Sequence, residues 1–267
     1  EVAPQTKKWL IAGTAITWSL VQLYCAFTFV LDILQVEMLH ITFALVLVFL
    51  LKPGPKPINP KGLGDCLLAI LAVAAGIYFL YSYPRIIERI RFVDDVYLSD
   101  IAACIVMIFL VLEGGRRLMG WGLSILGLVA IGYAFLGDLI PGALGHSSVS
   151  LESFTEFMVL TQEGIFGIPL RVSTTYVFLF VLFGAFLKYG RLGEFYNDLA
   201  VSVAGGMRGG PGKVAVISSS LLGTISGSAV ANVSTSGTFT IPMMKRAGYT
   251  PIAAGAVEAL ASTGSQL

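Results

Sequence analysis

The chain has 267 residues, of which 56% are hydrophobic and only 12% charged, with a formal net charge of +1. Soluble proteins carry roughly 25% charged residues, so this composition excludes an ordinary soluble enzyme, a disordered chain and a coiled coil. The near-zero net charge and the lack of a long basic run give no indication of a nucleic-acid partner. A polytopic membrane protein remains, embedded in a lipid bilayer.

Six apolar runs are long enough to cross a bilayer, whose hydrocarbon core needs about 20 helical residues. Because the backbone must satisfy its own hydrogen bonds in lipid, runs of this length predict helices rather than barrel strands. The sequence therefore predicts an all-α membrane protein with about six spans, at 9–31, 33–51, 66–83, 96–112, 118–136 and 172–187. Pro84 is expected to end the third span.

Lysine and arginine predict the orientation, because cytoplasmic loops of membrane proteins are enriched in them. A cytoplasmic N-terminus places 13 of the 17 basic residues on the cytoplasmic side, whereas the reverse places 4 there. We therefore predict that the N-terminus is cytoplasmic. The loop 84–96 contains arginines although this orientation places it on the outer side. Because these arginines alternate with acids, we expect the loop to form a short amphipathic helix at the membrane surface.

Several charged residues lie at the predicted outer ends of spans. Glu37 and Asp100 are expected to be solvated at the interface. Glu163 and Arg171 flank a short apolar stretch in the outer region, where they are expected to pair locally, with a role in a periplasmic entrance as the alternative.

The region after the sixth span is of a different kind. Residues 192–204 mix acids with aromatics, which predicts a helix lying in the membrane interface. The glycine-rich stretch 205–213 lacks the spacing of a phosphate-binding loop, since Val214 stands where Ser or Thr is needed. We expect a flexible hinge here.

Residues 214–244 are basic at both flanks, with Arg208 and Lys213 before and Lys245 and Arg246 after. Both ends are therefore predicted on the same, cytoplasmic side. Only 31 residues lie between Lys213 and Lys245, whereas two full spans need about 40. We predict a re-entrant hairpin of two helical arms joined by a non-helical polar tip over 226–232. Tight helix packing through small residues is the alternative explanation for this composition.

Glu258 lies in the otherwise apolar start of a further helix. A carboxyl group inside a membrane is costly and usually functional, so a proton or cation relay is one interpretation. An interfacial glutamate and a structural contact at the hairpin are the others. His40 and His146 lie apart and away from any candidate nucleophile, so the sequence does not predict an enzyme.

The motifs of the last third resemble a known family. They read GGPGKVAVISS from Gly209, GTISGSAVAN from Gly223, GTFTIP from Gly237 and AGAVEA from Ala254. They resemble the large membrane subunit of a tripartite ATP-independent periplasmic (TRAP) transporter, in its TAXI branch, where the small and large membrane subunits are fused. The similarity covers about 142–264, whereas over the first 110 residues only the four-span layout is similar.

The resemblance implies an elevator-type importer built of inverted repeats. In such a transporter a periplasmic substrate-binding protein delivers an organic anion, commonly a carboxylate, and a cation gradient drives its entry without ATP. It implies the cytoplasmic (inner) membrane of a bacterium or archaeon. It also implies a small-subunit-like four-helix domain at 1–115, a scaffold part at 116–204 and the first part of the transport domain at 205–267.

The resemblance also assigns residues, all of them hard oxygen donors suited to a hard cation. It implies substrate contacts at Asn232, Ser234 and Thr235. It implies a Na⁺ site formed by the hairpin tip and by the break after the next helix, at Ser226, Gly227, Ser228, Asn232, Thr263 and Gly264. The hydroxyl-rich tip favours Na⁺ slightly over H⁺, which Glu258 would carry. No cofactor is expected.

Two departures accompany the resemblance. Ser265 stands where the family often has Gly, and the sequence ends at Leu267, before the second repeat with its own hairpin. The missing C-terminal half is therefore expected as a partner. A non-transporting membrane scaffold or assembly subunit is the alternative function, and it would need no polar hairpin.

The predicted orientation can be tested by cysteine labelling in intact cells. Because 13 of 17 basic residues fall on one side, Ser148→Cys should react with a membrane-impermeant reagent added outside, and Lys61→Cys should not. The opposite labelling pattern would contradict the orientation.

Overall fold

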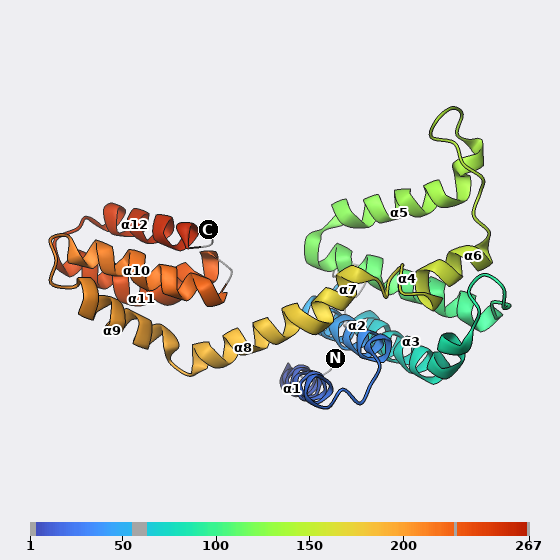
Figure 1. Cartoon of the computed structure of the whole chain (residues 1–267), viewed down its shortest axis with the longest axis horizontal. Helices are drawn as coiled ribbons and strands as arrows, with labels where there is room; N and C mark the ends of the chain where they lie inside the picture. The colour runs from blue at the N-terminus through green and yellow to red at the C-terminus, as the bar shows by residue number, and fades with distance from the viewer. Residues whose placement is uncertain (1–3, 55–62, 227–228, 266–267) are drawn as a thin grey trace. The chain divides into compact units, whose positions relative to one another are not determined.

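The structure is a computed structural model, which describes residues 4–54, 63–226 and 229–265. Every regular element in these ranges is a helix, so the predicted all-α class is confirmed. The chain divides into two compact units, Glu1–Val177 and Phe178–Leu267, which are described separately below (Figure 1).

Six helices in the described ranges are long and apolar enough to cross a membrane. The number expected from the sequence is confirmed, with shifted boundaries. The last one begins at Ile168 rather than 172 and includes a π-helical turn, Ser173–Val177. The helices of the first unit are α1 (Pro4–Thr28), α2 (Ile33–Leu51), α3 (Leu63–Glu88), α4 (Leu98–Met119), α5 (Trp121–Leu136), α6 (Leu151–Thr155) and α7 (Ile168–Val172).

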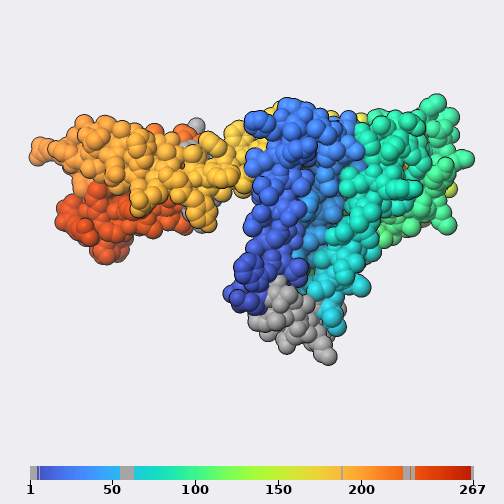
Figure 2. All heavy atoms as spheres, turned by 90° about the horizontal axis from the view of Figure 1, so that it is seen from below, coloured from blue at the N-terminus to red at the C-terminus, as the bar shows by residue number. Residues whose placement is uncertain are grey.

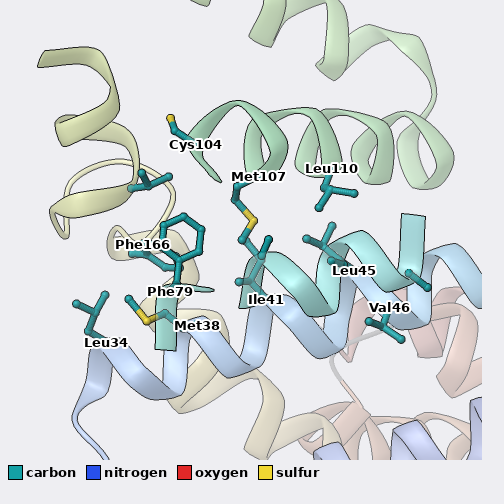
Figure 3. Packing of buried hydrophobic residues seen from close by; sticks show 14 of the residues in the cluster. Leu34, Met38, Ile41, Leu45, Val46, Phe79, Cys104, Met107, Leu110 and Phe166 are labelled. Atoms are coloured by element: carbon teal, nitrogen blue, oxygen red, sulfur yellow. The ribbon is translucent and has the colours of Figure 1, made fainter. Parts of the chain in front are cut away.

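Helix α2 lies at the centre of the first unit, in contact with α1, α3 and α4. A capping box fixes its start, where the Asp32 side chain accepts a hydrogen bond from the Leu34 N–H and Gln35 accepts one from the Asp32 N–H. Its buried face packs against Phe79 of α3 and Leu110 of α4, both fully buried (Figure 3). The resulting core extends over three spans.

The outer surfaces of the spans are apolar. Helix α1 runs along the outside of the first unit (Figure 2). It leaves Trp9, Leu20 and Phe27 exposed by 72%, 61% and 91%. In water such a surface would cause aggregation, whereas in a bilayer it contacts acyl chains. The exposed apolar residues therefore agree with a membrane-embedded unit.

Ion pairs hold the ends of the spans together. At one end Arg117 of α4 binds Asp65 of α3 at 2.6 Å and donates to the Lys52 carbonyl after α2 at 2.8 Å. At the other end of α4, Asp100 accepts from Arg85 of α3 at 2.5 Å. Successive helices among α2, α3 and α4 are therefore antiparallel. Which end faces the cytoplasm stays a prediction.

Two expectations about charges are wrong. Glu37 and Asp100 are fully buried rather than solvated. Arg171 does not bond Glu163 but pairs with Glu37 at 2.9 Å and donates to Gln162 at 2.6 Å. Burial of a carboxylate is costly unless the group is paired or hydrogen-bonded, and the arginine that pairs with Glu37 comes from a distant part of the chain that sequence spacing does not reveal.

The expectations for Pro84 and the loop after it are also wrong. Helix α3 continues through Pro84 to Glu88, as membrane helices allow because neighbouring groups take over the freed carbonyl. Residues 89–97 form turns rather than an amphipathic helix. Phe92 has a φ of 58° there, which interrupts helical geometry, and its N–H donates to Glu156.

The second unit contains α8 (Phe178–Tyr189), α9 (Leu192–Ala204), α10 (Gly210–Ser226), α11 (Ala229–Arg246) and α12 (Pro251–Gly264). Helix α9 has the bounds expected from the sequence. The two arms of the hairpin are confirmed as α10 and α11, which lie side by side with α12 against both (Figure 1). The described residues of the predicted non-helical tip, 226 and 229–232, are helical, contrary to expectation. Gly227 and Ser228 lie outside the described residues.

A sharp reversal joins α11 to α12. Gly248 has a φ of 95°, the Gly248 N–H bonds the Lys245 carbonyl and the Tyr249 N–H bonds the Met244 carbonyl. This is a Schellman motif, which glycine favours. Thr250 then caps α12 by accepting from the Ala253 N–H, with Pro251 as the first helical residue. The local sequence therefore reverses the chain direction, so that α12 runs back beside α11.

The close contact of α2 and α3 yields a prediction. A Cβ on Gly76 of α3 would collide with the Thr42 side chain of α2, whereas one on Gly132 of α5 would meet no atom within 4 Å. Gly76→Ala should destabilise the protein by about 1–3 kcal/mol, although alanine favours helix by roughly 1 kcal/mol. Gly132→Ala should be neutral or slightly stabilising. Thermal unfolding in detergent measures both, and equal midpoints would contradict the predicted clash.

Candidate functional site

The most unusual feature of the second unit is a buried carboxyl group. Glu258 of α12 is fully buried, and its partners are hydroxyl groups from three helices. Oε1 is contacted by Ser219 of α10 at 3.2 Å, by Ser262 of α12 at 3.2 Å and by Ser236 of α11. Oε2 is contacted by Thr240 of α11 at 2.5 Å. We call Glu258 and these four side chains the carboxyl cluster.

Helical periodicity brings the cluster together. Ser236 and Thr240 are four residues apart on α11, and Glu258 and Ser262 are four apart on α12, so each pair lies on one helix face. All four hydroxyl-bearing residues are at most 2% exposed. Three helices therefore direct polar side chains at one point inside an apolar domain.

A glycine allows the close approach of α12 to α11. A Cβ on Gly237 would lie 3.3 Å from Glu258 Cγ. A methyl group at this position would require the Glu258 side chain to shift by a few tenths of an ångström, so the lack of a side chain at Gly237 contributes to the geometry of the carboxyl cluster.

Asn232 connects the carboxyl cluster to residues nearer the hairpin tip. Its side chain is 1% exposed and its Nδ2 donates to the Ser219 carbonyl at 2.9 Å and to Ser265 Oγ at 2.8 Å. Ser265 in turn donates to the Ser262 carbonyl at 2.8 Å. Both amide hydrogens are used, while Oδ1 is buried and has no hydrogen-bond partner among the described residues. Asn232 thus presents an unpaired oxygen beside α10 and α12.

The site residues expected from the resemblance are only partly brought together. Ser234 is exposed on α11, and Thr235 is half-buried near Gly193 of α9. Ser226 ends α10. Gly227 and Ser228, expected as cation ligands, lie outside the described residues, so their placement is not described.

The expectation that the helix is unwound at Thr263 and Gly264 is wrong, because both residues belong to α12, which ends at Gly264. Thr263 is exposed and its hydroxyl donates to the Ala259 carbonyl of its own helix at 2.8 Å. The turn starts one residue later, at Ser265.

Glu258 is not solvated, since its exposure is 0%, and the alternative of a structural contact at the hairpin agrees with its hydroxyl partners. Sequence analysis missed its partners Ser219, Ser236, Thr240 and Ser262. A signal was present, because Asn232, Ser236 and Thr240 form an i, i+4, i+8 polar stripe on α11. In a membrane domain such a stripe indicates a polar partner on a neighbouring helix.

Known proteins resemble the chain over its C-terminal part. The sequence model of the family described as "Tripartite ATP-independent periplasmic transporter, DctM component" matches residues 106–267. A "Putative TRAP transporter large permease protein" of Haemophilus influenzae is 32% identical over 124 residues, which cover 45% of this chain and 29% of the relative.

Two further relatives show shorter similarity. A second putative TRAP transporter large permease protein of the same organism is 42% identical over 65 residues, 24% of this chain and 16% of its own length. The uncharacterized protein y4mL of Sinorhizobium fredii is 42% identical over 72 residues, 27% of this chain and 17% of its own length. The chain thus covers less than a third of the length of each relative. No solved structure matches it.

The two donated bonds of Asn232 yield a prediction. Asn232→Ala removes its bonds to Ser219 and Ser265, which should destabilise the second unit by about 1–3 kcal/mol. Thr238→Ala is the matched control on α11, because the exposed Thr238 hydroxyl donates to the Thr235 carbonyl of its own helix. Hydrogen exchange of α12 amides should accelerate in the first variant and stay unchanged in the second. Equal exchange rates would contradict a linking role for Asn232.

Proposed function

The chain belongs to the DctM component family of tripartite ATP-independent periplasmic transporters, and on this premise we propose that it is part of a permease that imports organic anions by secondary active transport. The observation that carries this proposal is the fully buried Glu258 among hydroxyl groups of three helices. Ionisable residues at such depth in membrane domains mark ion or substrate pathways.

We propose that the substrate is an organic anion, namely a carboxylate bound at the hairpin. Helix α11 starts at Ala229 with no acidic residue in its first turn, so its free N–H groups carry partial positive charge toward the tip. Asn232, Ser234 and Thr235 follow on the first two turns of α11. They are the proposed substrate contacts.

A cation gradient is the proposed driving force. Na⁺ would bind oxygen atoms at the tip and at the end of α12, namely Ser226, Gly227, Ser228, Asn232, Thr263 and Gly264. The buried, unpartnered Oδ1 of Asn232 supports such a site, because hard cations need convergent oxygen ligands. Glu258 supports H⁺ as the alternative coupling ion.

The remaining partners follow from the family. We propose that a periplasmic substrate-binding protein delivers the anion, and that the permease lies in the inner membrane with a cytoplasmic N-terminus. Residues 1–105 precede the stretch that matches the family. A fused small subunit of the TAXI type, with an elevator movement of the hairpin domain, is the proposed arrangement.

The alternative is a non-transporting scaffold or assembly subunit. The ion pairs of the first unit would suit it equally well, because Arg171–Glu37 and Arg117–Asp65 connect helices. A scaffold, however, has no need of a fully buried carboxyl group without a basic partner. The permease family likewise favours a transporter over an enzyme.

Uptake by the complete transporter in proteoliposomes tests the proposal. Radiolabelled mono- and dicarboxylates should accumulate only when the binding protein and an inward Na⁺ or H⁺ gradient are both present. Because the gradient supplies the free energy, an ionophore that collapses it should abolish accumulation, and ATP should add nothing. Vesicles without the binding protein are the control. Accumulation without any gradient would contradict secondary transport, and a complete lack of uptake would favour the scaffold.

A further inference from the structure

We propose that one end of the second unit binds the phosphate groups of anionic phospholipids. The binding surface consists of four basic side chains, Arg208, Lys213, Lys245 and Arg246, which we call the basic end. The proposal requires only that the unit lies in a bilayer, so it is independent of the proposed transport function.

The fold brings the four side chains to the same end of the unit. Arg208 lies between α9 and α10, and Lys213 lies in the first turn of α10. Lys245 and Arg246 form the last turn of α11. Because α10 and α11 are the two arms of a hairpin, the start of α10 lies beside the end of α11 (Figure 1).

Packing beneath the basic end fixes these helix ends to one another. A Cβ on Gly212 would lie 3.0 Å from the hydroxyl oxygen of Tyr249, which follows α11. Met244 of α11 and Ala215 of α10 are fully buried in one apolar cluster. The residues that carry the charges are therefore next to residues that are held in place.

The positive charge of the basic end is not compensated within the unit. All four side chains are exposed, and none forms an ion pair with a described residue. Of the acids on the neighbouring helices, Glu194 pairs with Arg191 at 3.0 Å and Glu258 is fully buried. Asp198 lies on α9 before Ala204, about 9 Å from the end of that helix.

Basic residues at helix ends of the first unit have a different role. Arg85 binds Asp100 of a neighbouring helix at 2.5 Å, and Arg117 binds Asp65 at 2.6 Å. Those charges hold helices together, whereas the charges of the basic end are left for a partner outside the unit.

Apolar side chains beside the basic ones indicate a lipid as that partner. Met207 and Ile252 are both exposed, and Lys213 Nζ lies 4.0 Å from Met207 Sδ. In a bilayer interface such apolar side chains reach the acyl region, while lysine and arginine extend to the headgroups. A soluble anion would match the charge but would leave the apolar side chains in water.

The chemistry of the side chains suits a phosphate diester. A lysine ammonium donates three hydrogen bonds and an arginine guanidinium five, and neither accepts any. Bonds from these groups to phosphate oxygens are charge-assisted. Each basic residue near an anionic membrane surface strengthens the attraction about fivefold, so the net charge of the headgroup decides the binding. Phosphatidylglycerol should therefore bind, and zwitterionic phosphatidylcholine should not replace it.

Hydrogen exchange of the chain in nanodiscs tests the site locally. The amides of 205–213 and 245–250 should exchange several-fold more slowly when the phosphatidylcholine of the disc is mixed with an equal amount of phosphatidylglycerol. The double variant Lys213→Gln, Lys245→Gln should lose this protection, because it removes two of the four charges. Equal exchange of the unmodified chain in both kinds of disc would overturn the proposal.

Two control variants separate charge from folding. The double variant Lys213→Arg, Lys245→Arg keeps the charges and should keep the protection. Arg191→Gln removes an exposed basic residue that already pairs with Glu194, and it should also keep the protection. Loss of protection in either control, to the extent seen with the glutamines, would overturn the assignment to the basic end.

Native mass spectrometry in detergent measures the affinity. The glutamine double variant should bind phosphatidylglycerol about 25-fold more weakly than the unmodified chain, and Arg191→Gln should bind it equally well. An unchanged affinity in the double variant would overturn the proposal even if that variant exchanged faster because of a folding defect.

The source of the phosphate is tested in nanodiscs of phosphatidylcholine alone. Neither inorganic phosphate nor a polyglutamate peptide should slow exchange at the basic end. Protection equal to that given by phosphatidylglycerol would assign the surface to a soluble anion or an acidic protein and overturn the lipid assignment. None of these measurements depends on uptake, so failure of the lipid site and failure of the transport function are distinguishable.

Discussion

A charged group inside a membrane needs a partner within the protein, and this requirement organises the structure. In the first unit the buried carboxyl groups of Asp65, Asp100 and Glu37 each pair with an arginine, at 2.6, 2.5 and 2.9 Å. Such pairs fix helices to one another, because separating them would leave a charge unpaired in low dielectric. In the second unit Glu258 has hydroxyl partners instead. The two units therefore meet the same requirement by different means.

The difference has a consequence for what each unit can do. An arginine pair keeps its carboxylate charged, so it supports one arrangement of the helices. Hydroxyl groups donate or accept according to need, so the carboxyl cluster joins three helices through neutral side chains.

The sequence predicted the elements well because hydrophobic length and charge are local properties. The six spans, helix α9 and the two hairpin arms were all predictable from apolar runs and flanking basic residues. The polar partners were not, because Arg171 and Glu37 are 134 residues apart and only the fold brings them together. Similarly, Pro84 looked like a helix end, since the neighbouring helices that let α3 continue are invisible to local reasoning.

In the candidate site, too, the sequence predicted what depends on neighbouring residues and missed what depends on contacts between helices. The depth of Glu258 was undecided in the sequence, because an acid seven residues after Pro251 fits an interface as well as an interior. The fold buries it, because the Schellman turn at Gly248 reverses the chain so that α12 packs against α11, and Gly237 of α11 leaves space beside the Glu258 side chain. The polar stripe on α11 then supplies two of the hydroxyl groups that contact the buried carboxyl group.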